Sequence, residues 1–182
     1  MRVIVAVTAA SGAIYAKQLL ERVTESQRVE RIALIFSENA QKVANYEGVT
    51  LPQSNKIEVM DNNNLFLSPA SGSAKWDSMV ICPSTVGTVG RIASGVSQSL
   101  IERAADVMLK ERRTLIVVVR ESPLSLIHLR NMTTLSEAGA IILPASPSFY
   151  SLPTDIGTLC QSITERIASL IGLEQKGFEW GA

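Results

Sequence analysis

The amino-acid sequence predicts an α/β fold in which helices cover both faces of a doubly wound, mostly parallel sheet. Apolar runs of strand length alternate with segments whose apolar residues recur at helical spacing, and most connections between them are short. The 182 residues are the usual size of one domain. Because neither an internal repeat nor a linker divides the sequence, we expect residues 1–182 to form one domain with a C-terminal tail from about residue 171.

The first part of the sequence predicts alternating strands and helices, followed by a long loop. Residues 2–7 are mostly β-branched, as in a strand that is buried on both faces. Gly12 follows, and apolar residues then recur at helical spacing between residues 14 and 23. Residues 48–75 are rich in Asn, Ser and Pro, and loops of this length are often functional. The remaining predicted elements are a strand at 31–36, a helix at 38–47 and a short strand at 57–60 inside the loop.

The second part continues the alternation. Residues 78–82 predict a core strand that Pro83 breaks, because proline cannot donate a hydrogen bond to a neighbouring strand. The final predicted helix covers 154–170 and precedes the tail. The elements predicted between them are helices at 86–93, 100–111 and 125–138 and strands at 115–119 and 140–143.

The composition excludes several classes of function. There are 17 Lys and Arg residues and 17 Asp and Glu residues, so the positive charge typical of proteins that bind nucleic acids or anionic membranes is missing. Two cysteines and one histidine are too few for a disulfide scaffold or a common zinc site. We interpret His128, in an apolar helical stretch, as structural and Cys82 as a small buried hydrophobic residue. No apolar run reaches the roughly 18–20 residues of a membrane span, and we expect a cytoplasmic protein.

Ligands of doubly wound sheets bind beyond the carboxyl ends of the strands, so the residues that follow each predicted strand are candidates. Small residues at 8–13 follow the first strand. A ligand can approach their backbone closely, and the next helix offers free N–H groups to an anion. An ordinary tight turn is the other interpretation. Ser37 ends the second strand, where it either caps a helix or contacts a ligand.

The third strand leads into a turn that suits a phosphate ester. Residues 84–88 bring three hydroxyls and a glycine to the start of a helix. Because this turn contains no lysine, it is not the P-loop of a nucleoside-triphosphate site. We therefore expect a monophosphate cofactor rather than a magnesium-bound nucleotide.

Charged and aromatic residues mark three further places. Arg120 and Glu121 directly follow the fourth strand, where the alternative is a surface salt bridge. Arg103 and Lys110 are spaced so that they share one face of a helix. Tyr150 follows the last strand, where its phenol either contacts a substrate or packs in the core.

Five stretches of the sequence, at 100–113, 120–124, 127–132, 139–144 and 147–150, together resemble the flavin prenyltransferase (UbiX-like) family. The resemblance covers nearly the whole chain. It implies a flavodoxin-like, Rossmann-type fold, reduced FMN as the prenyl acceptor and no metal. The implied reaction joins a dimethylallyl group from dimethylallyl phosphate to N5 and C6 of FMN. The implied assembly is a homododecamer, and the prenylated FMN serves a UbiD-type decarboxylase in ubiquinone biosynthesis or in aromatic acid decarboxylation.

The resemblance also implies roles for individual residues. Carboxylates that share proton handling would be Glu47 and Glu121. Cations and a phenol at the phosphate would stabilise the charge that develops as it leaves. The expected FMN contacts are Ala9, Ala10, Ser11, Ser37, Thr85, Val86, Gly87, Thr88 and Arg120. The expected contacts with dimethylallyl phosphate are Lys110, which is also counted as catalytic, Tyr150, Arg166 and Arg103, the last near a subunit boundary.

Three positions depart from the family pattern. Ala9 replaces a usual glycine, Thr85 stands where the family often has serine after Pro-Cys, and Leu65 replaces an active-site tryptophan. Two other functions stay open. One is an FMN-dependent decarboxylase of the same fold, although the catalytic histidine and the asparagine-containing loop of that group are missing from the expected places. The other is an FMN-binding protein without prenyl transfer.

Overall fold

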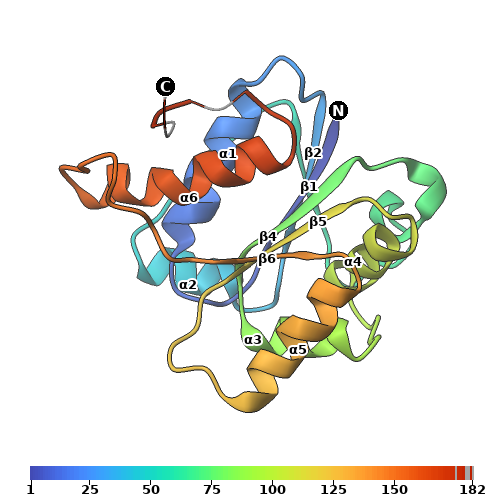
Figure 1. Ribbon diagram of the computed structural model, residues 1–182. Helices are drawn as coiled ribbons and strands as arrows, with labels where there is room; N and C mark the ends of the chain where they lie inside the picture. The colour runs from blue at the N-terminus through green and yellow to red at the C-terminus, as the bar shows by residue number, and fades with distance from the viewer. Residues whose placement is uncertain (175, 179–180, 182) are drawn as a thin grey trace.

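The computed structural model describes residues 1–174, 176–178 and 181, so part of the predicted tail lies outside the described residues. Its centre is a six-stranded parallel sheet with the order β3-β2-β1-β4-β5-β6 (Figure 1). The strand order reverses between β1 and β4, so the topological switch point lies there. The predicted doubly wound sheet is confirmed. The strands are β1 (Arg2–Val7), β2 (Arg31–Phe36), β3 (Ile57–Met60), β4 (Ser78–Ser84), β5 (Thr114–Val119) and β6 (Ile141–Pro144).

Helices cover both faces of the sheet. On one face, α1 (Ala13–Glu25) packs against α6 (Ile156–Leu170), and on the other lie α3 (Val86–Ala93), α4 (Leu100–Lys110) and α5 (Leu126–Glu137) (Figure 1). The short α2 (Ala40–Tyr46) follows β2. Two 3₁₀ turns, η1 (Ser68–Ala70) and η2 (Gly72–Ala74), lie in the long loop between β3 and β4.

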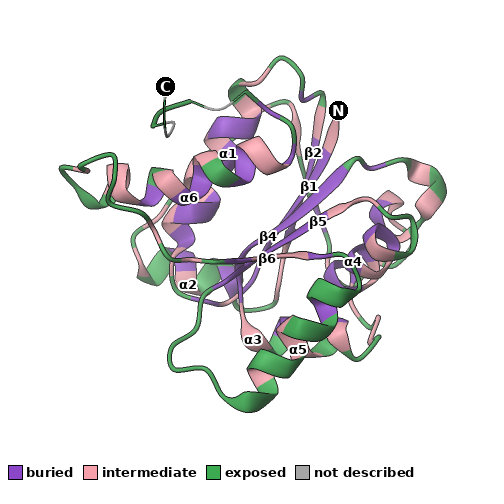
Figure 2. Cartoon of the chain, in the orientation of Figure 1, coloured by how far each residue is buried: buried purple, intermediate pink, exposed green. Residues whose placement is uncertain are grey.

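The core forms on both faces because alternate residues of a strand point to opposite sides. On β1, Val3, Val5 and Val7 join the cluster beneath α1 and α6, whereas Ile4 and Ala6 join the cluster beneath α3, α4 and α5. Double coverage explains why the strands are continuous apolar runs rather than alternating ones. Figure 2 shows buried central strands, whereas much of α5 is exposed.

The prediction that Pro83 ends the third core strand is wrong, because β4 continues to Ser84. The pairing with β5 shifts between Ile81 and Ser84, so the strand needs no N–H from the proline. The predicted helices at 125–138 and 154–170 begin one or two residues later because Ser125 and Asp155 are their N-caps. Within the described ranges, every helix is too short or too polar to cross a lipid bilayer.

Candidate active site

Direct hydrogen bonds tie together the carboxyl ends of β1 and β4. The backbone N–H and the hydroxyl of Thr8 both donate to the Pro83 carbonyl, at 3.2 and 2.9 Å. The N–H of Thr85 donates to Thr8 Oγ1 at 2.8 Å. Thr8 is buried, so this junction is protected from water. It places the β1 loop (residues 8–12) beside the α3 turn (Thr85–Thr88), and the structure thus brings these two predicted segments together.

The carboxylate of Glu47 occupies the N-terminus of α1. It accepts the N–H of Gly12 at 2.9 and 3.1 Å and the N–H of Ala13 at 2.7 Å. Glu47 lies at the C-terminus of α2, so the bond joins two helices far apart in sequence. The expectation that α1 offers these N–H groups to an anionic ligand is therefore wrong, because a side chain of the protein already holds them.

The same contacts determine the charge of Glu47. Burial raises the pKa of this carboxyl, but hydrogen bonds from Ser11, Gly12 and Ala13 and the charge of Arg120 outweigh it and lower the pKa below its ordinary value. An ionised, three-fold bonded carboxylate is a poor proton acceptor at neutral pH. Glu47 is suited to hold the β1 loop in place.

The conformation of the β1 loop requires glycine at one position. Gly12 has a φ of 102°, and a β-carbon there would lie 2.9 Å from the ring of Tyr15. Ala9, by contrast, does not have a positive φ. Its methyl group therefore adds no backbone strain. The departure from the family glycine at this position is compatible with the loop.

Several hydrogen-bond donors at the topological switch point are available to an anion or a carbonyl oxygen of a ligand. Within the described part of the chain, the N–H groups of Ala9, Ala10 and Ser11 make no hydrogen bond. The hydroxyl of Ser37 is also without a partner there, and because Asn39 is the N-cap of α2, capping by Ser37 is excluded. Together with the α3 turn and Arg120, this set fits the oxygen acceptors of a nucleotide monophosphate.

The α3 turn is organised by its own side chains. Thr85 caps α3 by accepting the N–H of Thr88 at 3.2 Å, and the two hydroxyls lie 3.0 Å apart. The first N–H groups of the helix, at Val86 and Gly87, precede the ladder and stay open to a ligand. The predicted hydroxyl-rich cradle is therefore present in the fold.

Two hollows flank the carboxyl end of β6. The first has a volume of about 680 Å³ and contains Arg120 and Glu121 with apolar side chains of α5. The second has a volume of about 660 Å³ and contains Arg166 of α6. Pro144 and Ser146 line both, so the hollows are neighbours. The structure thus places the predicted cations Arg120 and Arg166 in two neighbouring hollows that share Pro144 and Ser146.

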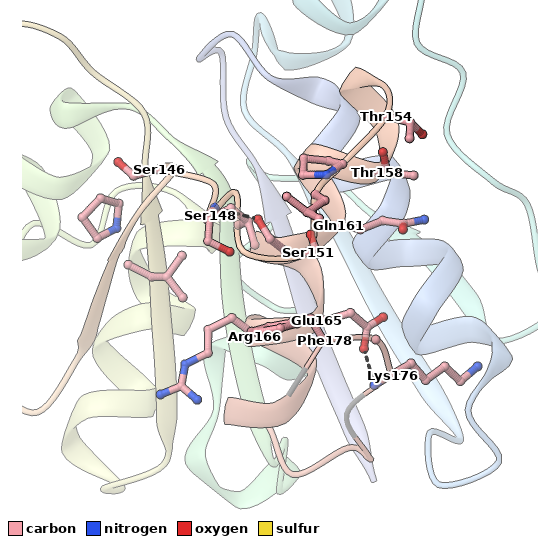
Figure 3. A pocket seen from close by; sticks show the side chains of 17 residues that line it. Ser146, Ser148, Ser151, Thr154, Thr158, Gln161, Glu165, Arg166, Lys176 and Phe178 are labelled. Atoms are coloured by element: carbon pink, nitrogen blue, oxygen red, sulfur yellow. Dashed lines mark hydrogen bonds between the residues drawn. The ribbon is translucent and has the colours of Figure 1, made fainter. Parts of the chain in front are cut away.

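The second hollow is closed on one side by the segment that follows α6. Phe178 lines it and stacks on Tyr150, with ring centroids 6.3 Å apart and planes 15° apart. Arg22, nearly buried, pairs with Glu165 at 3.0 Å, and Glu165 also accepts the N–H of Lys176 at 2.8 Å. Figure 3 shows these α6 and C-terminal side chains around the hollow, with Ser146 and Ser148 on the loop after β6.

Two predicted site residues, Lys110 and Arg103, lie away from the two hollows within a single chain. Lys110 ends α4 at the amino edge of the sheet and pairs with Glu111. The six-residue β5, roughly 20 Å long, separates that edge from Arg120. Arg103 pairs with Asp106 at 2.5 Å and donates to the Ala70 carbonyl at 3.2 Å.

The structure also shows the surroundings of His128, Cys82 and Leu65. His128 is structural, since its Nδ1 accepts the N–H of Ser125 at 3.2 Å in a capping box. Cys82 is fully buried, and burial raises the pKa of its thiol. Leu65, at the position of the family tryptophan, is 42% exposed. Within the described ranges, no three His, Cys, Asp or Glu side chains gather where they would hold a metal ion.

The sequence interpretation missed two residues beside the α3 turn. Arg91, one turn further along α3, donates to Thr88 Oγ1 at 3.3 Å and to Glu102 Oε1 at 2.5 Å. The spacing of three residues between Thr88 and Arg91 on a helix was the available signal. Glu102 is nearly buried, which sequence alone does not reveal.

Comparison with known proteins agrees with this arrangement. A model of the Flavoprotein family matches residues 1–172. The flavin prenyltransferase UbiX of Thermoplasma acidophilum is 43% identical over 176 residues, which are 95% of this chain and 96% of the relative. This chain belongs to the flavin prenyltransferase family.

Solved structures of two similar proteins place this flavin prenyltransferase among known folds. The crystal structure of AnUbiX (PadA1) in complex with FMN and dimethylallyl pyrophosphate has a TM-score of 0.91 and 37% identity, covering 100% of this chain and 97% of that one. The dodecameric FMN-dependent UbiX-like decarboxylase from Escherichia coli O157:H7 has a TM-score of 0.91 and 31% identity, covering all of both chains. The fold implied by the sequence resemblance is therefore confirmed.

Proposed function

We propose that the chain joins a dimethylallyl group from dimethylallyl phosphate to N5 and C6 of reduced FMN, without a metal. The observation that carries this function is the pair of adjoining hollows, with Arg120 and Glu121 in one and Arg166 in the other. The N–H of Arg120 donates to the carbonyl of Ser84 at 3.1 Å, which connects the first hollow to the start of the α3 turn. The AnUbiX relative, solved with FMN and dimethylallyl pyrophosphate, supports FMN and a phosphorylated dimethylallyl group as ligands. A protein that only stores FMN has no use for a second cation-lined hollow.

FMN is the ligand that suits the donors at the switch point. When bound, it supplies N5 and C6 as the atoms that receive the five-carbon group. The residues that hold it are Ala9, Ala10 and Ser11 through backbone N–H groups, Ser37 and Thr85 through hydroxyls, Val86, Gly87 and Thr88 through the helix start, and Arg120 through its charge.

The two glutamates divide their work differently from the shared proton handling that the sequence suggests. Glu47 is held by the N-terminus of α1 and positions the β1 loop. Glu121 is exposed in the first hollow, where the only hydrogen bond it accepts within the described residues is the N–H of Ser122 at 3.1 Å. Glu121 is therefore free to take a proton from the acceptor and pass it to the departing phosphate.

The departing phosphate needs positive charge and donors. Arg166, which lines the second hollow, and Tyr150, which stacks on Phe178 of that hollow, supply a guanidinium and a phenol from this chain. Lys110 ends α4 at the opposite edge of the sheet, so it reaches the site only from a second copy of the chain. Arg103, near the start of α4 and bonded to Asp106 and the Ala70 carbonyl, would contribute from the boundary between two copies.

A homo-oligomer, with twelve subunits as in the E. coli relative, provides that second copy. Its formation is favoured by exposed apolar residues at the start of α5, among them Leu126 at 60% and Ile127 at 69% exposure. The product then serves a UbiD-type decarboxylase in the cytoplasm, in ubiquinone biosynthesis or aromatic acid decarboxylation.

The test is release of inorganic phosphate from dimethylallyl phosphate under anaerobic conditions. The wild-type protein with reduced FMN should release phosphate, and protein without FMN should not. Phosphate release that does not require FMN would contradict the proposal.

A subunit-mixing experiment tests the shared site. Lys110→Ala and Glu121→Gln oligomers should each be inactive, whereas oligomers reassembled from both variants should regain activity, because some sites then combine one intact contribution from each. Mixtures as inactive as the separate variants would contradict a site in which Lys110 and Glu121 come from different copies.

A further inference from the structure

A buried carboxylate lies behind the α3 turn. Glu102, 5% exposed, accepts the N–H groups of Gln98 at 2.9 Å and Ser99 at 3.0 Å, which lie directly before α4. Its other oxygen accepts Arg91 Nε at 2.5 Å. Burial raises the pKa of Glu102, but these hydrogen bonds outweigh it and lower the pKa below its ordinary value. The carboxylate is therefore charged and holds Arg91 in one orientation.

Arg91 extends from this anchor toward the start of α3. Its Nη2 donates to Thr88 Oγ1 at 3.3 Å. Its Nη1 would lie 3.5 Å from a β-carbon placed on Gly87, so the guanidinium lies along the first turn of the helix. One side chain thus connects a fixed negative charge to a hydroxyl of the α3 turn.

The burial of Thr88 fixes the direction of the next hydrogen bond. A guanidinium only donates, so one lone pair of Thr88 Oγ1 accepts from Arg91, and the hydrogen of this buried hydroxyl needs an acceptor within the fold. Thr88 is 2% exposed, and among the described residues the only acceptor that its own hydrogen reaches is Thr85 Oγ1, 3.0 Å away. Thr85 Oγ1 also accepts the N–H of Thr88 at 3.2 Å. With both lone pairs engaged, the hydroxyl of Thr85 turns its hydrogen outward to the site.

We propose that Arg91 is a positioning residue for FMN: through Thr88 it orients the hydroxyl of Thr85 to donate to an acceptor oxygen of the cofactor. This inference rests on the proposed function, since it takes FMN as the ligand of the α3 turn. The acceptor is either a phosphate oxygen or a carbonyl oxygen of the flavin ring, and both accept the same hydrogen bond. A hydroxyl already oriented for donation loses less rotational freedom when the ligand binds.

The experiment measures FMN affinity by fluorescence quenching in the assembled protein. Arg91→Met keeps the chain length and removes all donors, and Thr88→Val keeps the shape and removes the hydroxyl. Each should weaken FMN binding by about tenfold, as for one oriented hydrogen bond. The double variant should also be weaker by about tenfold rather than a hundredfold, because both changes break the same chain. Arg91→Lys and Thr88→Ser, which keep a cation and a hydroxyl, should retain most of the affinity.

Arg2→Met is the matched control. The side chain of Arg2 is 44% exposed, close to the 49% of Arg91, and each arginine pairs with a glutamate. Arg2, however, lies at the amino end of β1, away from the α3 turn. The control variant should bind FMN as the wild type does. If Arg91→Met does not fold, Thr88→Val against Thr88→Ser still tests the hydroxyl chain.

Riboflavin, which lacks the phosphate, identifies the acceptor oxygen. Unchanged riboflavin affinity in Arg91→Met assigns the acceptor to the phosphate, and a parallel loss assigns it to the ring. Additive losses in the double variant, or unchanged FMN affinity in the single variants, would overturn the positioning role while leaving the proposed function intact. A wild-type protein that does not bind FMN would overturn the proposed function itself.

Discussion

Replacement of Glu47 by glutamine removes the charge at the N-terminus of α1 and keeps the shape of the side chain. The carboxylate accepts the N–H of Gly12 at 2.9 Å and of Ala13 at 2.7 Å. A glutamine side chain has one oxygen that can accept from one of these N–H groups, and its NH₂ group then faces the second N–H group, to which it cannot bond. Hydrogen bonds to charged groups contribute about 1.5–3 kcal/mol each, and an anion at a helix N-terminus adds about 0.3–1 kcal/mol.

For the half-exposed Glu47, we expect Glu47→Gln to lower the free energy of unfolding by about 2 kcal/mol at pH 7. In a chain of this size, that loss lowers the Tm by roughly 4–8 °C. Urea denaturation followed by circular dichroism measures the free energy, and calorimetry measures the Tm.

The effect should depend on pH. Because the pKa of Glu47 is lowered in the folded state, its carboxylate stabilises the fold fully above the ordinary carboxyl pKa of 4.5, and this contribution is lost as the pH falls through the folded-state pKa. The stability curves of wild type and Glu47→Gln should therefore converge in acid. Glu38→Gln, at an exposed carboxylate of the preceding turn, is the control and should match wild type. An equal loss of stability at pH 7 and pH 3 would show that the ionised carboxylate of Glu47 does not stabilise the fold.

Three further changes test the rest of the site. Gly12→Ala forces a φ of 102° on alanine and a 2.9 Å contact with Tyr15, so denaturation should show a loss of about 2–4 kcal/mol. Gly48→Ala, with positive φ but open space, should lose only about 1 kcal/mol, and equal losses would exclude the clash. Glu121→Gln should lower the single-turnover rate by about 10²–10⁴-fold while FMN stays bound, and full activity would remove Glu121 from proton transfer. Arg166→Met should raise the KM for dimethylallyl phosphate by about tenfold or more with FMN affinity unchanged, and an unchanged KM would place the phosphate elsewhere.

The sequence predicts most elements of the fold because the central strands β1, β2, β4 and β5 are apolar runs that are covered on both faces. Pro83 is the instructive failure. Its missing N–H argues for a break, but the register shift beside it makes that N–H unnecessary. Helix starts differ from prediction where Asn39, Ser125 and Asp155 cap rather than join the helix.

The candidate site is predictable where it follows strand ends and not where it depends on distant side chains. The α3 turn and Arg120 were found because ligands of parallel sheets bind at carboxyl ends. Glu47 on the α1 terminus is a contact across 35 residues that no local pattern reveals. The position of Lys110 follows from topology, since a helix that connects parallel strands returns to the amino edge.

Prenyl transfer to FMN is tested by the mass of the flavin released after an anaerobic reaction. Purified protein is mixed with reduced FMN and dimethylallyl phosphate, and the mass of the extracted flavin is measured by mass spectrometry. The wild type should release FMN that has gained one dimethylallyl unit, and Glu121→Gln should release unmodified FMN. Unmodified FMN from fully loaded wild-type protein would contradict this prediction and leave a flavin-binding protein without prenyl transfer.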